Sequence, residues 1–497
     1  MASLVGKAPK RVVSQEAFDE IVKENMVEFE MDLEEALEDA VTQLAEQGVD
    51  VSACSIVTTV KGRECVAKVR ETMEKFNELV KEEDSGDLSG GGMIASLEAI
   101  KAGCSASSDF RMLACKEGAM GGVAYCCKKF VENAEIVEMA LRCIGALASN
   151  AGSGDEDPSS TSAAALLKRE ALPKKGLEAL CSCLKTHMGN ASVVAAGASA
   201  VQKLCLRFEP NKAAFREAGM NKIIQKALRT HNNDKQVISA VCGLICTYTA
   251  DDDRREGVHP GTFMRARELG EDRRRGAVVP IFSGLKENAD DARFVGDVCF
   301  ALKHLAVNDT ICKNITKVGG LEATLDVFSK HMEDAVVASR VCSFLKAVAR
   351  NDENKRILCL RRTQASDPEE SSVARGLGLI LHSMETHLLV PSVVEQAIAA
   401  FSVVTLRQPE ICERIAEAGM VNLIVAAMSK YPEKPSVQRA AMITLRNMVS
   451  SWQNEELKSV ILDEGVEPLI RSARAKHPEC EDVAFAALRD LGLNYHD

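Results

Sequence analysis

The sequence feature that most constrains the fold is a frame of glycine, histidine and valine that recurs along the chain. A glycine is followed after 11 or 12 residues by a histidine or an aromatic residue, and six residues later by a valine. Successive glycines lie 43–58 residues apart, which is a spacing typical of repeat proteins. The clear copies begin at Gly176, Gly219, Gly320, Gly376, Gly419 and Gly465, and looser copies begin at Gly118 and Gly276.

Each copy of the frame predicts three helices. A short helix ends at the glycine in a left-handed conformation, a second runs to the histidine, and a third begins near the valine. The third is rich in small apolar residues, so a single copy cannot bury it, whereas stacked copies would form a continuous core. We therefore predict an all-α fold, a right-handed armadillo-repeat α-solenoid of about eight three-helix units from about residue 105 onward.

The rest of the chain divides by composition. Residues 14–48 hold twelve acidic residues and one basic residue, so the formal net charge of −11 is concentrated there. The predicted parts are a basic flexible N-terminus (1–13), an acidic helical extension (14–82), with one amphipathic helix over 14–47 and another over 63–81, a linker (83–104), and a solenoid (105–497) with insertions at 150–163, 251–275 and 361–375. The acidic helix could cap the first repeat, dock in the protein's own groove, or bind a partner.

Charge and hydropathy restrict the class of partner and the compartment. The body has no extended basic stripe, which argues against nucleic-acid binding. No apolar run is long enough to cross a membrane, and the opening MASLVGKAPK lacks the apolar core of a signal peptide. The 18 cysteines include no C-x-x-C motif and stand in apolar helical contexts, as buried thiols do. We expect a monomer in the cytoplasm or nucleus, without cofactor or metal.

Two other patterns favour structural roles over chemistry. The recurring histidines would each cap the end of a second helix, and successive copies would lie too far apart to share a metal ion. Cys126, Cys127, Cys181 and Cys183 have no base placed by the sequence to activate them, which disfavours a thiol-dependent enzyme or redox protein. No catalytic residue is therefore assigned.

The third helices should line the concave groove of the solenoid, where partners would bind. Importin-type solenoids capture basic cargo with a ladder of asparagines and tryptophans, but here the position ten residues past each valine holds only one asparagine. A transport-type cargo adaptor is thus the less favoured alternative, and a mildly acidic or mixed segment suits the groove better. The candidate partner-binding residues in the groove are Lys203, Thr247, Lys303, His304, Lys346, Arg446 and Asn447.

A second candidate surface opens the largest insertion. Asp251, Asp252, Asp253 and Arg254 begin a stretch with seven acidic residues and seven arginines. These charges could pair internally, dock a partner or, least favoured, hold a divalent cation, although the D-x-D-x-D-G frame of a calcium loop is missing.

Three blocks of sequence carry a family resemblance. They are VSQEAFDEIVKENMVEFEMDLEEALEDAV (13–41) with QGVD (47–50), TADDDRR (249–255), and HPECEDVAFAALRDLG (477–492). Together they resemble the armadillo repeat-containing protein 6 family over nearly the whole chain. The resemblance implies an armadillo solenoid that acts as a non-enzymatic interaction protein. The function expected is that of a scaffold or adaptor that presents its concave groove to other proteins.

Overall fold

The structure is a computed structural model of the 497-residue chain. It describes residues 11–12, 15–29, 31, 33–47, 49–50, 60–82, 90–149, 172–253, 261–360, 374–450 and 455–494. The chain divides into two compact units, the first comprising residues 1–123 with 149–171 and the second residues 124–148 with 172–497. Each unit is described by itself.

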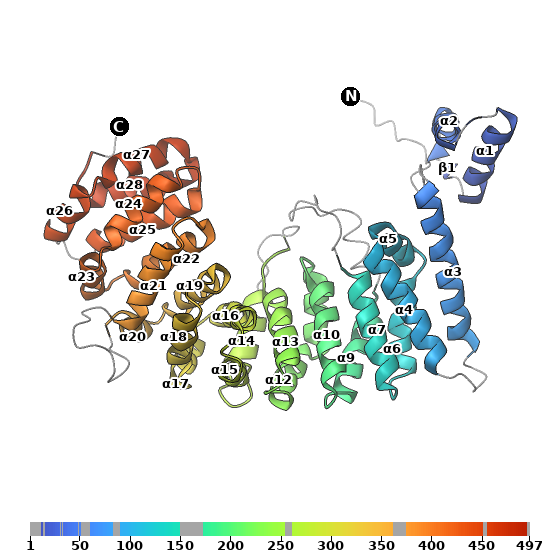
Figure 1. The fold of residues 1–497 in the computed structure, drawn as a ribbon, viewed down its shortest axis with the longest axis horizontal. Helices are drawn as coiled ribbons and strands as arrows, with labels where there is room; N and C mark the ends of the chain where they lie inside the picture. The colour runs from blue at the N-terminus through green and yellow to red at the C-terminus, as the bar shows by residue number, and fades with distance from the viewer. Residues whose placement is uncertain are drawn as a thin grey trace, which may run out of the picture. The chain divides into compact units, whose positions relative to one another are not determined.

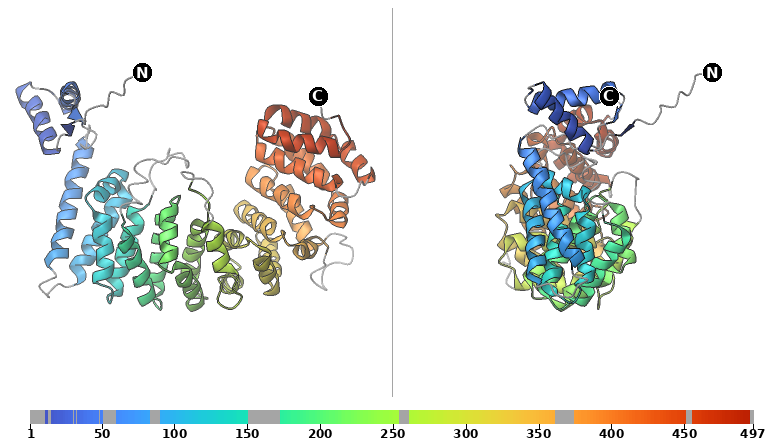
Figure 2. Two further views of the ribbon diagram at one scale, coloured as in Figure 1. Left: turned by 180° about the vertical axis from the view of Figure 1, so that it is seen from behind. Right: turned by 90° about the vertical axis from the view of Figure 1, so that its right-hand side faces the viewer.

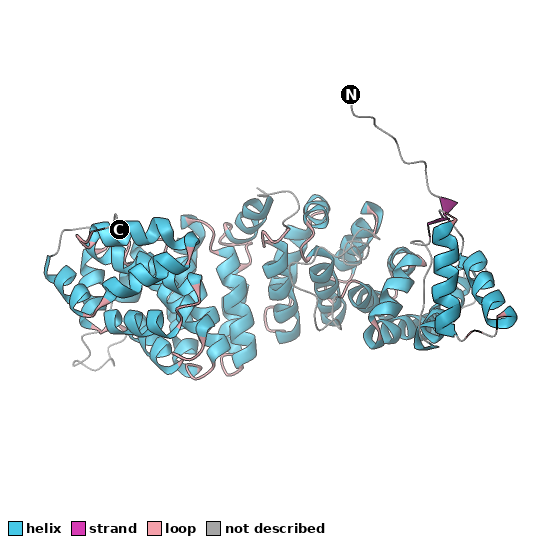
Figure 3. Cartoon of the chain, turned by 90° about the horizontal axis from the view of Figure 1, so that it is seen from above, coloured by secondary structure: helices cyan, strands magenta, loops and turns pink. Residues whose placement is uncertain are grey.

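The acidic segment of the first unit folds as a helical hairpin. Helices α1 (Gln15–Glu28) and α2 (Leu33–Glu46) bury a shared cluster that includes Phe18, Val22 and Leu37. The prediction of one helix over 14–47 is therefore wrong, because a single helix would leave this apolar stripe in water. A parallel pair of two-residue strands, β1 (Arg11–Val12) and β2 (Val49–Asp50), brings the two ends of the hairpin together (magenta in Figure 3).

The predicted linker over 83–104 is wrong from residue 90 onward. Helix α3 (Val60–Glu82) is followed by helix α4 (Gly90–Ala106), which packs against α3 and α5 (Ser108–Lys116). The apolar side chains of α4 recur at helical spacing and are buried, but the glycines at its start resemble those of a linker. The buried residues are Met93, Leu97, Ile100 and Cys104.

The remaining helices repeat in the predicted order of first, second and third helix (Figures 1 and 2). Besides α5, the first helices are α11 (Glu209–Glu217), α14 (Gly261–Gly270), α17 (Asp309–Lys317), α20 (Asp352–Cys359), α23 (Pro409–Glu417) and α26 (Glu455–Asp463). The second helices are α6 (Ala119–Lys129), α9 (Lys174–Thr186), α12 (Met220–Thr230), α15 (Val278–Glu287), α18 (Gly320–Lys330), α21 (Arg375–Thr386), α24 (Met420–Lys430) and α27 (Val466–Lys476).

The third helices form the core of the second of the two compact units. They are α7 (Ala134–Leu147), α10 (Ala191–Cys205), α13 (Lys235–Tyr248), α16 (Ala292–Leu305), α19 (Ala335–Val348), α22 (Pro391–Val404), α25 (Pro435–Ser450) and α28 (Glu481–Asp490), which follows a short 3-10 turn at Pro478–Cys480. Each packs along the next far more extensively than successive first or second helices do, so the third helices are the closely spaced inner layer. The predicted fold class, an all-α armadillo solenoid, is confirmed.

The frame glycines end the first helices as predicted wherever a first helix leads directly into the second. Gly219 has a φ of 89° and Gly419 a φ of 82°, a left-handed conformation that other residues adopt at a cost. In the unit that contains α17 the left-handed residue is Gly319, one position before the glycine of the frame. Gly376 differs, because it lies inside α21, where a Cβ atom would come within 2.6 Å of the Leu358 carbonyl oxygen.

The segment 251–275 is only partly an insertion. Its residues 261–270 form α14, the first helix of the fourth unit, which packs against α12, α13 and α16. The prediction that residues 261–270 belong to an inserted loop is therefore wrong. Arg265 and Leu269 of this polar segment are buried, at 1% and 0% exposure, so the segment packs as a helix. The insertion at 150–163 and residues 361–373 of the third lie outside the described residues. In the part of the chain that the structure describes, no helix is long and apolar enough to cross a membrane.

Candidate interaction surface

A ladder of hydrogen bonds joins successive three-helix repeat units at the ends of the second helices. The Nε2 atom of each frame histidine lies 2.6–2.7 Å from a backbone carbonyl oxygen of the preceding unit. That carbonyl belongs to the residue just after the corresponding frame position, and the hydroxyl of Tyr431 makes the same contact with Leu388. The pairs are His187–Val131, His231–Met188, His331–Ala289, His387–Met332 and His477–Pro432. The histidines therefore have a structural role in the stack.

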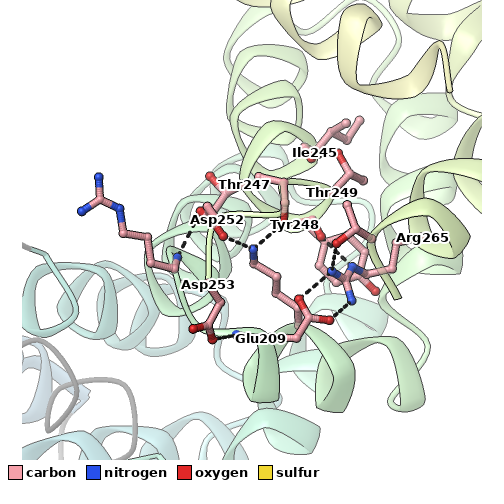
Figure 4. Close-up of polar contacts among 12 residues, drawn as sticks. Glu209, Ile245, Thr247, Tyr248, Thr249, Asp252, Asp253 and Arg265 are labelled. Atoms are coloured by element: carbon pink, nitrogen blue, oxygen red, sulfur yellow. Dashed lines mark hydrogen bonds and ion pairs between the residues drawn. The ribbon is translucent and has the colours of Figure 1, made fainter. Parts of the chain in front are cut away.

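One unit lacks this contact and is joined to its neighbour differently. Asn288, which replaces the histidine, donates a hydrogen bond to Gly284 of its own helix. Arg265 of α14 instead pairs with both carboxylate oxygens of Glu209 on α11, at 2.6 and 2.8 Å, and donates to the Tyr248 carbonyl oxygen (Figure 4). Because Arg265 is almost fully buried, this pair fixes α14 against the preceding unit.

The acidic run before α14 belongs to the same joint. The carboxylate of Asp252 pairs with the buried ammonium of Lys212, and the carboxylate of Asp253 accepts the backbone N–H of Glu209 at 2.8 Å (Figure 4). Two of the predicted docking residues thus face inward, because the buried Lys212 needs a counter-charge. Asp251 is exposed, and Arg254 lies outside the described residues.

A row of partly exposed side chains runs along the third helices. The position nine residues after each frame valine, or its equivalent Phe294, is half-buried in every unit from α10 to α25. We call this set the inner row. Its members are Gln202, Cys246, Lys303, Lys346, Ser402 and Arg446.

The position one residue further on, which the sequence analysis assigned to the groove, is less accessible. Thr247 and Asn447 are only 8% and 7% exposed, which leaves little of either side chain for a partner to contact. The Thr247 hydroxyl donates to the Gly243 carbonyl oxygen of its own helix, and the Asn447 amide donates to the Ser402 carbonyl oxygen at 2.8 Å. Lys203 and His304 hold the same position and are half-buried.

An aromatic ring with cationic neighbours marks the centre of the inner layer. Phe300 of α16 is half-buried, with the Lys303 Nζ atom 4.9 Å and the Arg340 Cζ atom 5.5 Å from its ring centroid. The His304 ring lies edge-on at 5.0 Å. Burial, together with the charge of Lys303, lowers the pKa of His304 to about 4, so the imidazole is neutral near pH 7. Lys303 and His304 are among the residues predicted from the sequence, whereas Phe300 is not.

The two central lysines of the inner row lack a carboxylate partner. Lys303 on α16 and Lys346 on α19 form no ion pair within the residues that the structure describes. Burial and the charge of Lys346 lower the pKa of Lys303. Arg340 and Arg446, by contrast, pair with Asp297 and Asp490. The surface therefore carries uncompensated positive charge only at its centre, as far as the described residues reach.

The thiols of the chain are packing groups in this structure. Fifteen of the seventeen described cysteines are buried, and none of these seventeen takes part in a disulfide. Burial raises the pKa of Cys181, Cys299 and Cys342 to about 12, which keeps them protonated. Cys183 differs, since a hydrogen bond with Cys127 lowers its pKa. Among the described residues, no group of three or more His, Cys, Asp or Glu side chains could hold a metal ion.

The stacked three-helix units and their inner layer define an armadillo-repeat protein, a class whose members typically act as non-enzymatic interaction scaffolds. The family model ARMC6 matches residues 69–496, and a second model, the armadillo repeat-containing protein 6 N-terminal domain, matches residues 10–74. The chain therefore belongs to the armadillo repeat-containing protein 6 family.

Known relatives agree with this assignment, and a solved structure shares the fold. The human armadillo repeat-containing protein 6 is 29% identical over 422 residues, 82% of this chain and 76% of the human one. The Drosophila melanogaster homolog is 26% identical over 408 residues, 80% of this chain and 78% of that one. The crystal structure of an engineered protein matches with a TM-score of 0.60 and 15% identity, covering 96% of this chain and 98% of that chain.

Proposed function

We propose that this protein is a non-enzymatic scaffold that holds an extended segment of a partner protein along the inner row of its third helices. The observation that carries the proposal is the inner row itself, a line of half-buried side chains from Gln202 to Arg446. Each repeat contributes one member at the same helical position, so a chain laid across the third helices would meet a regular series of contacts.

The surroundings of the inner row favour a polypeptide partner. The position three residues before each member holds a small side chain in most units, namely Ser199, Gly243, Ser343 and Ala399. Ser199, Gly243 and Ala399 are half-buried, so this position is partly accessible on α10, α13 and α22. The row also mixes lysine, amide and hydroxyl groups, which bind both the charged and the polar groups of a peptide.

The rest of the structure supplies a rigid support for such a surface. The histidine ladder and the Arg265–Glu209 pair fix neighbouring units to each other, so the inner row is held in one arrangement before a partner arrives. A preorganised surface loses less conformational entropy on binding. A partner in the cytoplasm or nucleus suits a chain with this many free thiols.

Steric blocking of the inner layer tests the proposal. Ser199→Arg and Ala399→Arg together place two long side chains on half-buried positions of α10 and α22 without touching the lysines. The matched control is Lys222→Glu with Glu353→Arg, at exposed positions of α12 and α20. Partners recovered with the wild type by quantitative mass spectrometry are then purified and their affinities measured for all three proteins.

The expected result is a partner that binds the wild type and the control equally and binds the blocked variant much more weakly. All three proteins must show the same helical circular dichroism for the comparison to count. A partner that binds the blocked variant as tightly as the wild type would show that the inner row is not the binding surface.

A further inference from the structure

The centre of the inner layer holds an accessible aromatic ring between two lysine-bearing helices. On the third helices before and after α16, the positions equivalent to Phe300 are Gly243 and Ser343. The Phe300 ring is half-buried, and the side chain of Arg340 from α19 lies over it. Lys303 lies 4.9 Å from its centroid, so an apolar surface and a cation share one place.

The two lysines beside this ring have no carboxylate of the described residues to neutralise their charge. Lys303 and Lys346 occupy the same position on adjacent third helices, and no carboxylate among the described residues lies within 4.0 Å of either ammonium. Burial, and after it the charge of Lys346, lowers the pKa of Lys303. An anion placed between them would remove this unfavourable interaction.

Among the described members of the inner row, lysines without a carboxylate partner occur only at this pair. The inner-row neighbours on the two sides are Cys246 on α13 and Ser402 on α22, both neutral groups. The guanidinium of Arg340, which also faces the Phe300 ring, is neutralised by Asp297 at 2.5 Å. The uncompensated charge thus spans two helices and matches one or two carboxylates rather than a long polyanion.

We propose that Phe300, Lys303 and Lys346 form a seat for an acidic segment of a partner protein, with carboxylates on the two lysines and an apolar side chain from the same face of the segment against the ring. This inference rests on the proposed function, since it names the partner chemistry for the central part of the same surface. The free carboxylate groups of aspartate or glutamate supply the charge, and a leucine or similar side chain contacts the accessible part of the Phe300 ring.

The spacing of the lysines sets the spacing of the acidic residues. Adjacent packed helices lie about 8–10 Å apart. An extended chain advances about 3.3 Å per residue, so side chains two residues apart are separated by about 7 Å. Flexible lysine side chains cover the difference, so two glutamates two residues apart reach both ammonium groups. An apolar side chain on the same face lies a further two residues away, as in Leu–Ser–Glu–Ser–Glu, because alternate side chains of an extended chain point in opposite directions.

Peptide binding to the full-length protein tests the seat. The probes are a 12-residue peptide with a central Leu–Ser–Glu–Ser–Glu in a glycine–serine sequence, and the same peptide with Leu–Ser–Gln–Ser–Gln. Calorimetry at physiological ionic strength should show about tenfold tighter binding of the glutamate peptide to the wild type. Lys303→Gln with Lys346→Gln should abolish this preference, whereas Lys222→Gln with Lys226→Gln on exposed positions of α12 should keep it. Phe300→Ala should weaken both peptides by a similar factor.

Three results would overturn the inference. They are the absence of binding of the glutamate peptide to the wild type, equal binding of the two peptides, or an unchanged preference in the Lys303/Lys346 variant. Failure here is separable from failure of the proposed function. If the Ser199/Ala399 blocked variant loses a partner that the Lys303/Lys346 variant keeps, the scaffold stands and the acidic seat does not.

Discussion

Replacing Arg265 with methionine should weaken the joint between the third and fourth units more than any other single substitution that we consider. Arg265 is 1% exposed, and its removal leaves the 13%-exposed carboxylate of Glu209 without its counter-charge and the Tyr248 carbonyl oxygen without a donor. Breaking a buried pair from one side costs about 3–5 kcal/mol. Methionine keeps most of the side-chain volume, so this cost comes from charge and hydrogen bonding rather than from a cavity.

A double-mutant cycle measures how far the contribution of Arg265 to stability depends on Glu209. Glu209→Leu alone leaves a buried guanidinium and should also be strongly destabilising, whereas Arg265→Met with Glu209→Leu removes both charges and should recover most of the loss. A long repeat array does not unfold in one step, so the local opening free energy is the quantity to measure. Native-state hydrogen exchange of the backbone amides in α11 and α14 reports it.

The reasoning would be refuted if the double variant were as unstable as the sum of the two single variants. Such additivity would mean that the two side chains do not depend on each other. Exchange in α24 and α27, far along the chain, serves as the internal control and should stay unchanged in all three variants.

Three further predictions concern the frame and the inner layer. His331→Leu removes the hydrogen bond to the Ala289 carbonyl oxygen and should cost about 1–3 kcal/mol in the local opening free energy, measured by hydrogen exchange of α18. Gly219→Ala forces a side chain into a φ of 89° and should cost about 1 kcal/mol or more in the local opening free energy, whereas Gly189→Ala, with no positive φ and no atom within 4 Å of the place that its Cβ would take, should be nearly neutral; hydrogen exchange of α12 and α10, respectively, measures the two changes. The pKa of His304 lies near 4 in the folded state, below its unfolded value of about 6.5, so the unfolded chain takes up a proton that the folded chain does not, and stability falls as the pH falls through this window. His304→Asn should therefore reduce the loss of local stability between pH 7 and pH 5 by about 2 kcal/mol, and an unchanged pH dependence of the local opening free energy of α16 would contradict the assignment.

The sequence predicts the repeat because the residues that end one helix and begin the next recur in each three-helix unit. Left-handed glycines such as Gly219 and buried frame residues such as Val237 follow from local rules of helix termination and periodicity, and the structure places both as expected. The hairpin at α1 and α2 was missed because the two acidic segments share one helical period. The helix α4 was missed because its first three residues are glycines.

The residues of the third helices that face a partner depend on how each helix is rotated about its axis, and the sequence does not determine this rotation. The inner row lies one residue before the position predicted from the spacing. One residue along a helix is a rotation of about 100°, so the two positions point in different directions. Only the burial of Thr247 and Asn447 distinguishes the two positions. Similarly, the partners of Asp252 and Asp253 are Lys212 and Glu209, which lie 40 or more residues earlier and carry no local signal.

Site-specific photo-crosslinking tests the central claim most directly. A photoreactive amino acid is introduced one position at a time at Gln202 and Ser402 of the inner row, and at the exposed outer positions Lys222 and Glu353. The account predicts that the same partner segment is crosslinked from both inner positions and from neither outer position. Crosslinks to a partner from the outer positions alone would contradict it and would move the binding surface away from the third helices.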